Sequence, residues 1–243
     1  SSNYTAGDAE TTLDSWRKHL YETFTSREIE DKSYLDIFME VIKSDPRHID
    51  ERTVDVYRCP NPECPTEGAE AHIHTDIYDF GICDDCSVEV YPTDSLRTHE
   101  NVSETQPNGA AISAVMQVLE HLTLCAYIRY LSENNPSRLE KVGFVVDGPL
   151  AVYDTPAWFH EPVLDTIRRV GDKQRANGFS PPVIVGVEKS GQFKDHADNI
   201  KHAMPDGSVL GMSNQYIYEY VKSGTTTLEY GTRDHYGWPF IYK

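Results

Sequence analysis

The sequence predicts an α/β protein with a small cysteine-rich segment placed ahead of its main domain. In the second half, short apolar runs alternate with helical stretches, which is the pattern of strand–helix–strand units. In the first half, four of the five cysteines form two close pairs within the turn-rich stretch Cys59–Tyr91. We therefore expect a helical lead-in over residues 1–50, a metal-binding insertion over 51–105 and the main domain over 106–243.

The N-terminal part is expected to be helical. Apolar residues recur at three- and four-residue spacing between Thr12 and Lys43, which predicts two helices with a break near Thr25–Ser26. The polar stretch Ser1–Glu10 ahead of them is typical of a flexible lead-in. Thr53–Tyr57 alternates apolar and polar residues and predicts a short strand.

The second half is expected to form the sheet and its helices. A long helix is predicted over Ala110–Ser132, and its apolar residues on all sides predict burial on most faces. The apolar runs Val142–Val146 and Val183–Val187 are typical of strands in a sheet covered on both faces. The other expected elements are helices over Glu161–Asn177 and Lys194–Ala203, helix or strand over Leu210–Val221 and Thr225–Tyr230, and a final strand over Trp238–Tyr242.

The net charge of −17 argues against a nucleic-acid partner, because phosphate binding rewards Lys and Arg. The acidity is uneven, however. Residues 1–58 carry 8 basic and 13 acidic side chains, residues 59–110 carry 1 and 11, and residues 111–243 carry 13 and 15. The objection therefore applies weakly to the last segment. An acidic proteome, as in salt-loving cells, is an alternative explanation of the excess.

Targeting signals are not evident. No apolar run approaches the roughly 18–20 residues of a membrane helix, and no basic-then-apolar signal peptide stands at the start. A soluble cytoplasmic protein is therefore expected.

The cysteine spacing predicts a structural zinc site. Cys59 and Cys64 form a C-x4-C pair, eighteen residues intervene, and Cys83 and Cys86 form a C-x2-C pair. Four thiolates leave no open position on the ion, so its role would be structural. Disulfides and free thiols are the alternatives, and His72 and His74 are possible substitute ligands. The fifth cysteine, Cys125, lies among apolar residues and is expected to be a core thiol.

Two carboxylates are candidate ligands for a catalytic Mn²⁺ or Mg²⁺. Asp147 follows a buried strand, where open α/β sheets place ligands, and Glu120 lies within the long apolar helix, where a carboxylate needs a partner. Hard oxygen ligands suit these ions, which activate water in phosphodiester hydrolysis. The alternatives remain open: Asp147 caps a turn, and Glu120 lies on a solvent-facing side.

Lys189 is a candidate phosphate-binding residue. It follows the second apolar strand in a turn rich in glycine and serine, where a point charge reaches a phosphate. Glu188 is an alternative partner for it. Gln192, Asp195 and His196 follow at the start of a helix, whose free N–H groups favour anions; a helix cap for Asp195 and a solvated surface position for His196 are the alternatives.

Several separated segments, in order, resemble the NurA family of nucleases in its zinc-binding variety. Val145–Ala151 with Pro156–Trp158 is similar to the family's second acidic motif. Ile184–Phe193 is similar to its strand-then-lysine segment, and Val118–Leu122 to its helix with a metal-binding Glu. The remaining similar segments are the cysteine segment with Tyr91–Asp94 and His99–Glu100, and the strand-like Tyr230–Gly231 and Tyr236–Lys243.

The resemblance implies an RNase H-like mixed sheet flanked by helices, with Glu120, Asp147 and Lys189 in the catalytic site. It further implies Mn²⁺-dependent endo- and exonuclease action on single- and double-stranded DNA. The family works as a dimer with a HerA-type hexameric ATPase, a DNA translocase, in DNA end processing or phage defence.

Two family motifs have no counterpart in the chain. The first acidic motif, Asp-Gly-Ser on an opening strand, is not matched before Glu120, and no residue matches the C-terminal catalytic His. We therefore expect a partial nuclease core that belongs to a longer protein and is inactive alone. The competing hypothesis is a catalytically incomplete, zinc-stapled protein-binding module. A redox role for Cys83 and Cys86 is a weaker third interpretation.

Overall fold

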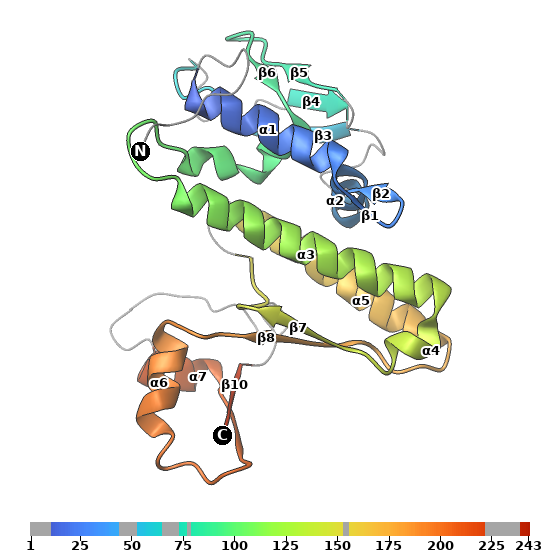
Figure 1. Cartoon of the computed structure of the whole chain (residues 1–243), viewed down its shortest axis with the longest axis vertical. Helices are drawn as coiled ribbons and strands as arrows, with labels where there is room; N and C mark the ends of the chain where they lie inside the picture. The colour runs from blue at the N-terminus through green and yellow to red at the C-terminus, as the bar shows by residue number, and fades with distance from the viewer. Residues whose placement is uncertain (1–10, 44–52, 65–72, 77–78, 153–155, 222–238) are drawn as a thin grey trace. The chain divides into compact units, whose positions relative to one another are not determined.

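The computed structural model describes residues 11–43, 53–64, 73–76, 79–152, 156–221 and 239–243 (Figure 1). The chain divides into two compact units. Unit 1 comprises Ser1–Lys141 and Val152–Pro182, and unit 2 comprises Val142–Ala151 and Val183–Lys243. Helices and small sheets occur in both units, so the protein belongs to the mixed α/β class that the sequence predicts.

Two short-range caps fix the N-terminal helices. The hydroxyl of Thr11 accepts a hydrogen bond from the backbone N–H of Asp14, and Ser33 and Asp36 form a reciprocal capping box. Each cap satisfies N–H groups that a helix leaves free at its start. The elements are α1 (Thr12–Ser26), the hairpin strands β1 (Glu28–Ile29) and β2 (Lys32–Ser33), and α2 (Tyr34–Ile42). The two predicted helices and the break after Ser26 are confirmed.

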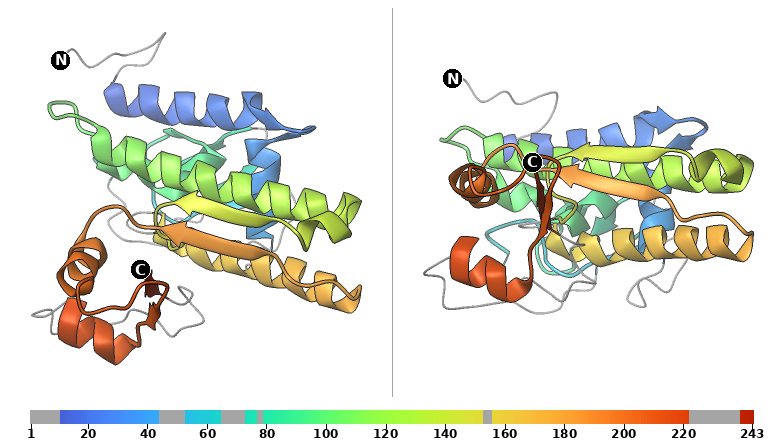
Figure 2. Two further views of the ribbon diagram at one scale, coloured as in Figure 1. Left: turned by 60° about the horizontal axis from the view of Figure 1, so that its bottom comes forward. Right: turned by 90° about the horizontal axis from the view of Figure 1, so that it is seen from below.

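Two long helices run side by side in unit 1, α3 (Gly109–Asn134) and α5 (His160–Ala176) (Figure 2). Both match the predicted helices within two residues. A single turn, α4 (Pro136–Leu139), follows α3, and a 3-10 turn, η3 (Ala157–Phe159), precedes α5. The predicted burial of α3 on most faces is wrong for one side, where four large apolar side chains are exposed: Ile112, Met116, Tyr127 and Tyr130.

The core of unit 1 lies between α1, α2, α3 and α5. Phe38 of α2 is fully buried, and its ring lies 6.2 Å from that of Phe24, 5.7 Å from that of Phe159 and 6.4 Å from that of Trp158. Offset and edge-on aromatic pairs at these separations add to the stabilisation that burial itself provides. The same cluster includes Val118, Leu122 and Cys125 of α3 and Val163 of α5.

The cysteine segment of unit 1 contains two small antiparallel sheets. The sequence predicts only the first strand, because the other strands are short and show little alternation of apolar and polar residues. The elements are β3 (Thr53–Val56) paired with β4 (Ile73–Asp76), β5 (Gly81–Ile82) paired with β6 (Glu89–Val90), and two 3-10 turns, η1 (Pro92–Leu96) and η2 (Thr98–Asn101).

Unit 2 is built on a parallel pair of strands, β7 (Gly143–Asp147) and β8 (Val183–Val187), with Asp147 opposite Val187. Both strands were predicted within one residue. The other elements are α6 (Gln192–Ile200), β9 (Val209–Gly211) antiparallel to β10 (Phe240–Tyr242), α7 (Asn214–Tyr216) and a π-helical turn, η4 (Ile217–Val221). The prediction for Thr225–Tyr230 lies outside the described residues.

Within the described residues one face of the β7–β8 pair is exposed, contrary to the expectation of a sheet covered on both faces. Val145 is 74% exposed and Val183 is 61% exposed. Within the described part of the chain these two strands form a sheet of their own, and every other sheet there also has two strands. Apolar runs predict strands correctly but say little about what covers them, because the covering elements lie elsewhere in the sequence.

Among the described residues one helix, α3, is long and apolar enough to cross a membrane by length and composition alone. Its buried side packs against α2 and α5 in the core. Core helices of water-soluble proteins meet the same criterion, so this is weak evidence for a membrane span.

Candidate metal centre

Two local turns place the four predicted cysteine ligands. Cys59 follows β3, and the turn to Cys64 is closed by a hydrogen bond from the Cys64 N–H to the carbonyl of Asn61 (3.1 Å). The second pair sits at the tip of the β5–β6 hairpin. There the N–H of Cys83 donates to the Val88 carbonyl (3.0 Å), and the N–H of Ser87 donates to the Cys83 carbonyl (2.8 Å).

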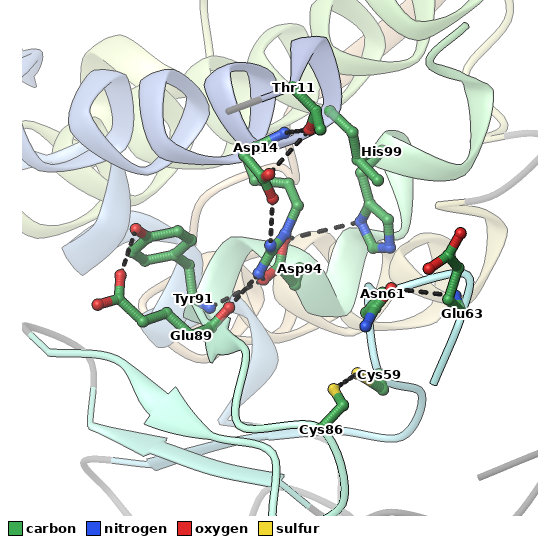
Figure 3. Close-up of polar contacts among 12 residues, drawn as sticks. Thr11, Asp14, Cys59, Asn61, Glu63, Cys86, Glu89, Tyr91, Asp94 and His99 are labelled. Carbon is green, nitrogen blue, oxygen red and sulfur yellow. Dashed lines mark hydrogen bonds and ion pairs between the residues drawn. The ribbon is translucent and has the colours of Figure 1, made fainter. Parts of the chain in front are cut away.

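These turns bring all four Sγ atoms to within 4.8 Å of one another. The Sγ atoms of Cys59 and Cys86 are 3.5 Å apart, and Figure 3 shows these two side chains facing each other. Those of Cys64 and Cys83 are 3.9 Å apart. A tetrahedral zinc with Zn–S bonds of about 2.3 Å requires S–S separations of about 3.8 Å. The cluster therefore has the dimensions of a four-thiolate zinc site.

The disulfide alternative does not fit this geometry. None of the four cysteines forms a disulfide in the described structure, and the sulfur separations exceed the roughly 2.05 Å of a disulfide bond. Among the described residues no other group of three or more candidate ligands converges in this way. His72 and the side chain of His74, the possible substitutes, lie outside the described part of the structure.

The cluster is partly buried, and ionising its four neighbouring thiols is unfavourable without a cation. Cys59 and Cys83 are buried beside Val56 and Val90, and this burial raises the pKa of both thiols. Burial also acts to raise the pKa of Cys86, but hydrogen bonds, first among them the one with the Val88 backbone, lower it to about 7. Four thiolates repel one another unless a cation neutralises them, and zinc binding would therefore release protons.

A buried ion pair, which the sequence did not predict, ties this segment to α1. The guanidinium of Arg17 donates to both carboxylate oxygens of Asp94 in η1, at 3.0 and 2.7 Å, and also to the backbone carbonyl of Glu89 in β6. The Tyr91 N–H donates to Asp94 at 2.8 Å, and His99 Nδ1 lies 3.7 Å from Asp94 Oδ1. Figure 3 shows Asp94, Tyr91 and His99 between α1 and the cysteine cluster.

The pair is almost completely removed from water, with Arg17 3% and Asp94 2% exposed. Burial acts to lower the pKa of Arg17, but the charge of Asp94 and the hydrogen bonds to it raise the pKa above its usual value. The two residues are 77 positions apart, so no local sequence pattern identifies them.

The predicted residues Asp147 and Lys189 meet in unit 2. Asp147 ends β7, Lys189 stands two residues beyond β8, and the lysine Nζ lies 2.7 Å from the aspartate Oδ2. Both side chains are 69% exposed. The described partner of Lys189 is thus Asp147 rather than its neighbour Glu188.

The backbone beside this pair depends on a glycine. The N–H of Gly148 donates to the Val187 carbonyl at 3.0 Å, and a Cβ built on Gly186 would stand 2.5 Å from the Gly148 carbonyl oxygen. Only glycine permits this approach of the chain after β7 to β8. The approach fixes the direction in which Asp147 leaves the sheet.

The other candidate residues occupy simpler positions. Glu120 is exposed on α3 in unit 1, and metal ligation by Glu120 together with Asp147 stays a prediction. Asp195 lies in the first turn of α6, whose N-cap is Gly191. His196 is half-buried, with its Nε2 2.9 Å from the Tyr216 hydroxyl, so it is not a fully solvated surface residue. Cys125 is fully buried, as predicted.

Comparison with protein-family models, with curated proteins and with solved structures finds no match to this chain.

Proposed function

We propose that this chain contributes to a metal-dependent DNA nuclease of the NurA type, with the four-cysteine cluster as its structural zinc site. One observation carries the proposal. Asp147 and Lys189, both singled out by motif, lie together at the carboxyl ends of neighbouring parallel strands. This edge is where open α/β sheets bind ligands. The RNase H-like arrangement of the core is part of the proposal.

The chain's own groups suit phosphodiester chemistry. Asp147 supplies an exposed carboxylate, a hard oxygen ligand of the kind that Mn²⁺ and Mg²⁺ prefer. The family resemblance implies Glu120 as the second ligand. The ion would activate water and stabilise the leaving oxygen. Lys189 would bind a phosphate oxygen of DNA as a point charge and would hold Asp147 in place before the substrate arrives.

The test is Mn²⁺ binding by calorimetry alongside Mn²⁺-dependent cleavage of single- and double-stranded DNA. Asp147→Asn should weaken Mn²⁺ binding at least tenfold and remove any cleavage that the unaltered chain supports, and Glu120→Ala should do the same. Asp198→Asn is the matched control, because Asp198 is an exposed carboxylate of unit 2 that pairs with Lys194 and Lys201. Mn²⁺ affinity that is unaffected by Asp147→Asn would contradict the proposed site.

The proposed partners follow from the family resemblance. We propose a homodimer that works with a HerA-type hexameric ATPase in the cytoplasm, in DNA end processing or phage defence. Co-sedimentation of the chain with such an ATPase measures this directly. A chain that stays monomeric and apart from the ATPase would remove this part of the proposal.

A second candidate function is a zinc-stapled protein-binding module. The observation that favours it is the exposed apolar side of α3, where Ile112, Met116, Tyr127 and Tyr130 share one face at 3.6 residues per turn. Exposed apolar patches mark protein-binding surfaces. A zinc-loaded chain that neither cleaves DNA nor binds Mn²⁺ would support this second candidate function.

A further inference from the structure

Unit 1 contains a cavity of about 350 Å³ between α2, α3 and α5, away from the cysteine cluster. Its size falls within the usual range of small-molecule sites, roughly 300–1,000 Å³. The cavity takes residues from three helices of the core, so its walls are held by the same packing that holds the unit together. The nuclease proposal makes no use of it.

The lining is basic although the chain as a whole is acidic. Four of its residues are cations, Lys43, Arg129, Arg169 and Lys173, and two are carboxylates, Glu40 and Glu133. The lining therefore carries a formal charge of +2 in a chain whose net charge is −17. Such a gathering of positive charge favours a dianionic ligand.

Some of these cations are paired with carboxylates, and others are available to a ligand. Arg129 lies 2.8 Å from Glu40, which also pairs with Lys32 at 2.7 Å. Arg169 donates from Nη2 to the Thr166 hydroxyl and from Nε to the Asp165 carbonyl, both at 3.3 Å, which leaves its Nη1 group for a ligand. Among the described residues no carboxylate lies within ion-pair distance of the Lys43 or Lys173 ammonium groups.

A buried hydroxyl in the cavity wall lacks a partner. Ser132 of α3 is 3% exposed, and its Oγ makes no hydrogen bond within the described structure. Helical hydroxyls commonly bond back to a carbonyl one turn earlier, as Thr123 does to Leu119 at 2.7 Å. A buried hydroxyl without a partner costs stability, and rotation of this side chain toward a ligand in the cavity would supply that partner.

We propose that this cavity binds a small molecule through a phosphate group. A phosphate monoester carries about −1.5 to −2 charges at pH 7, which matches the lining. Lys43, Lys173 and Arg169 bind its oxygens, and the Ser132 hydroxyl donates to it. Glu133 accepts a hydrogen bond from a hydroxyl or amino group elsewhere on the ligand. These three charged side chains and one hydroxyl supply the hydrogen-bond donors that the phosphate oxygens require.

The test is isothermal titration of the zinc-loaded full chain with inorganic phosphate, at an ionic strength matched with sodium chloride. Lys173→Gln should raise the Kd about fivefold or more, because a charge-assisted hydrogen bond is lost. Lys18→Gln is the matched control: Lys18 is an exposed lysine of α1 in the same unit, outside the cavity. An equal loss in both variants would overturn the proposal in favour of general charge attraction.

Ser132→Ala separates binding from structure. This variant should raise the Kd about threefold while leaving the thermal midpoint of the free protein unchanged or higher, because it removes an unpartnered buried hydroxyl. A lower midpoint with unchanged phosphate affinity would mean that Ser132 is structural and would overturn its assigned role as a ligand donor.

Two further titrations identify the source of the phosphate. A nucleoside monophosphate tests a free phosphate ester, and a single-stranded oligonucleotide without terminal phosphates tests the phosphodiester backbone of nucleic acid. We expect the first to bind in a Lys173-dependent way. Lys173-dependent binding of the oligonucleotide alone, or acetate binding as tightly as phosphate, would overturn the assignment.

Discussion

The buried ion pair between α1 and η1 offers the sharpest test of the packing described above. Asp94 receives hydrogen bonds from two nitrogens of Arg17 and from the Tyr91 backbone, and both charged side chains are almost fully buried. Asp94→Asn keeps the shape and one acceptor oxygen but leaves the Arg17 charge with only the partly exposed carboxylate of Asp14, 3.4 Å away, to compensate it. Removing one partner of a buried pair costs about 3–5 kcal/mol.

The assay is urea unfolding followed by tryptophan fluorescence. Trp158 is a suitable probe, because its Nε1 donates to the Ser95 carbonyl beside Asp94 at 2.9 Å. The matched control is Glu100→Gln, which breaks the exposed pair with Arg97 and should cost about 1 kcal/mol or less.

A double variant shows whether the charge is the cause. Arg17→Met combined with Asp94→Asn removes both charges, so it should be more stable than Asp94→Asn alone. Asp94→Asn should also speed transfer of zinc to a chelator, because Arg17 binds the backbone of β6, the strand that follows Cys86. A loss no larger than that of Glu100→Gln would refute the reasoning.

Three further predictions follow from the structure. Gly186→Ala should destabilise unit 2 by roughly 1–3 kcal/mol, because the added Cβ clashes with the backbone. Gly143→Ala in the adjacent strand is the control, because its Cβ would meet nothing within 4 Å. Amide hydrogen exchange of β8 measures both variants, and equal protection of β8 in the two would contradict the clash. Burial lowers the pKa of His99, so the unfolded state binds more protons than the folded state. The free energy of unfolding should therefore fall as the pH drops below about 6.5, the pKa of an unperturbed histidine. A His99→Gln variant with the same acid dependence would exclude this cause. A strong chelator should release one zinc per chain and expose four thiols to a thiol reagent. Burial raises the pKa of Cys125 to about 12, so this thiol should react only after unfolding. Five reactive thiols before unfolding would be incompatible with the described core.

Several features were predictable because their causes are local. The break between α1 and α2 and the start of α2 follow from caps within four residues of one another, such as Ser33 and Asp36. The cysteine cluster follows from turns that need only the spacing within each cysteine pair, plus a loop long enough to bring the pairs together. Local hydrogen bonds hold these turns, so residue spacing carries the information.

The features that sequence reasoning missed depend on contacts between distant segments. The strands β4, β5 and β6 are short and gain their hydrogen bonds from partners rather than from an apolar pattern of their own. The exposure of Val145 and Val183 likewise contradicts what their apolar runs suggested. Whether an apolar strand is covered depends on the surrounding elements, not on the strand.

The sequence by itself determined the mixed α/β class, the long helices, the positions of the two strands of unit 2 and the four cysteines of the candidate metal site, since each rests on periodicity or short spacing. Only the tertiary structure decided the pairing of Lys189 with Asp147, the burial of Arg17 against Asp94 and the cavity that gathers Lys43, Arg169 and Lys173. Lys189 and Asp147 are 42 positions apart, Arg17 and Asp94 are 77 apart, and Lys43 is 126 positions from Arg169. Their meeting depends on the burial and packing of the elements that carry them, which local spacing does not encode.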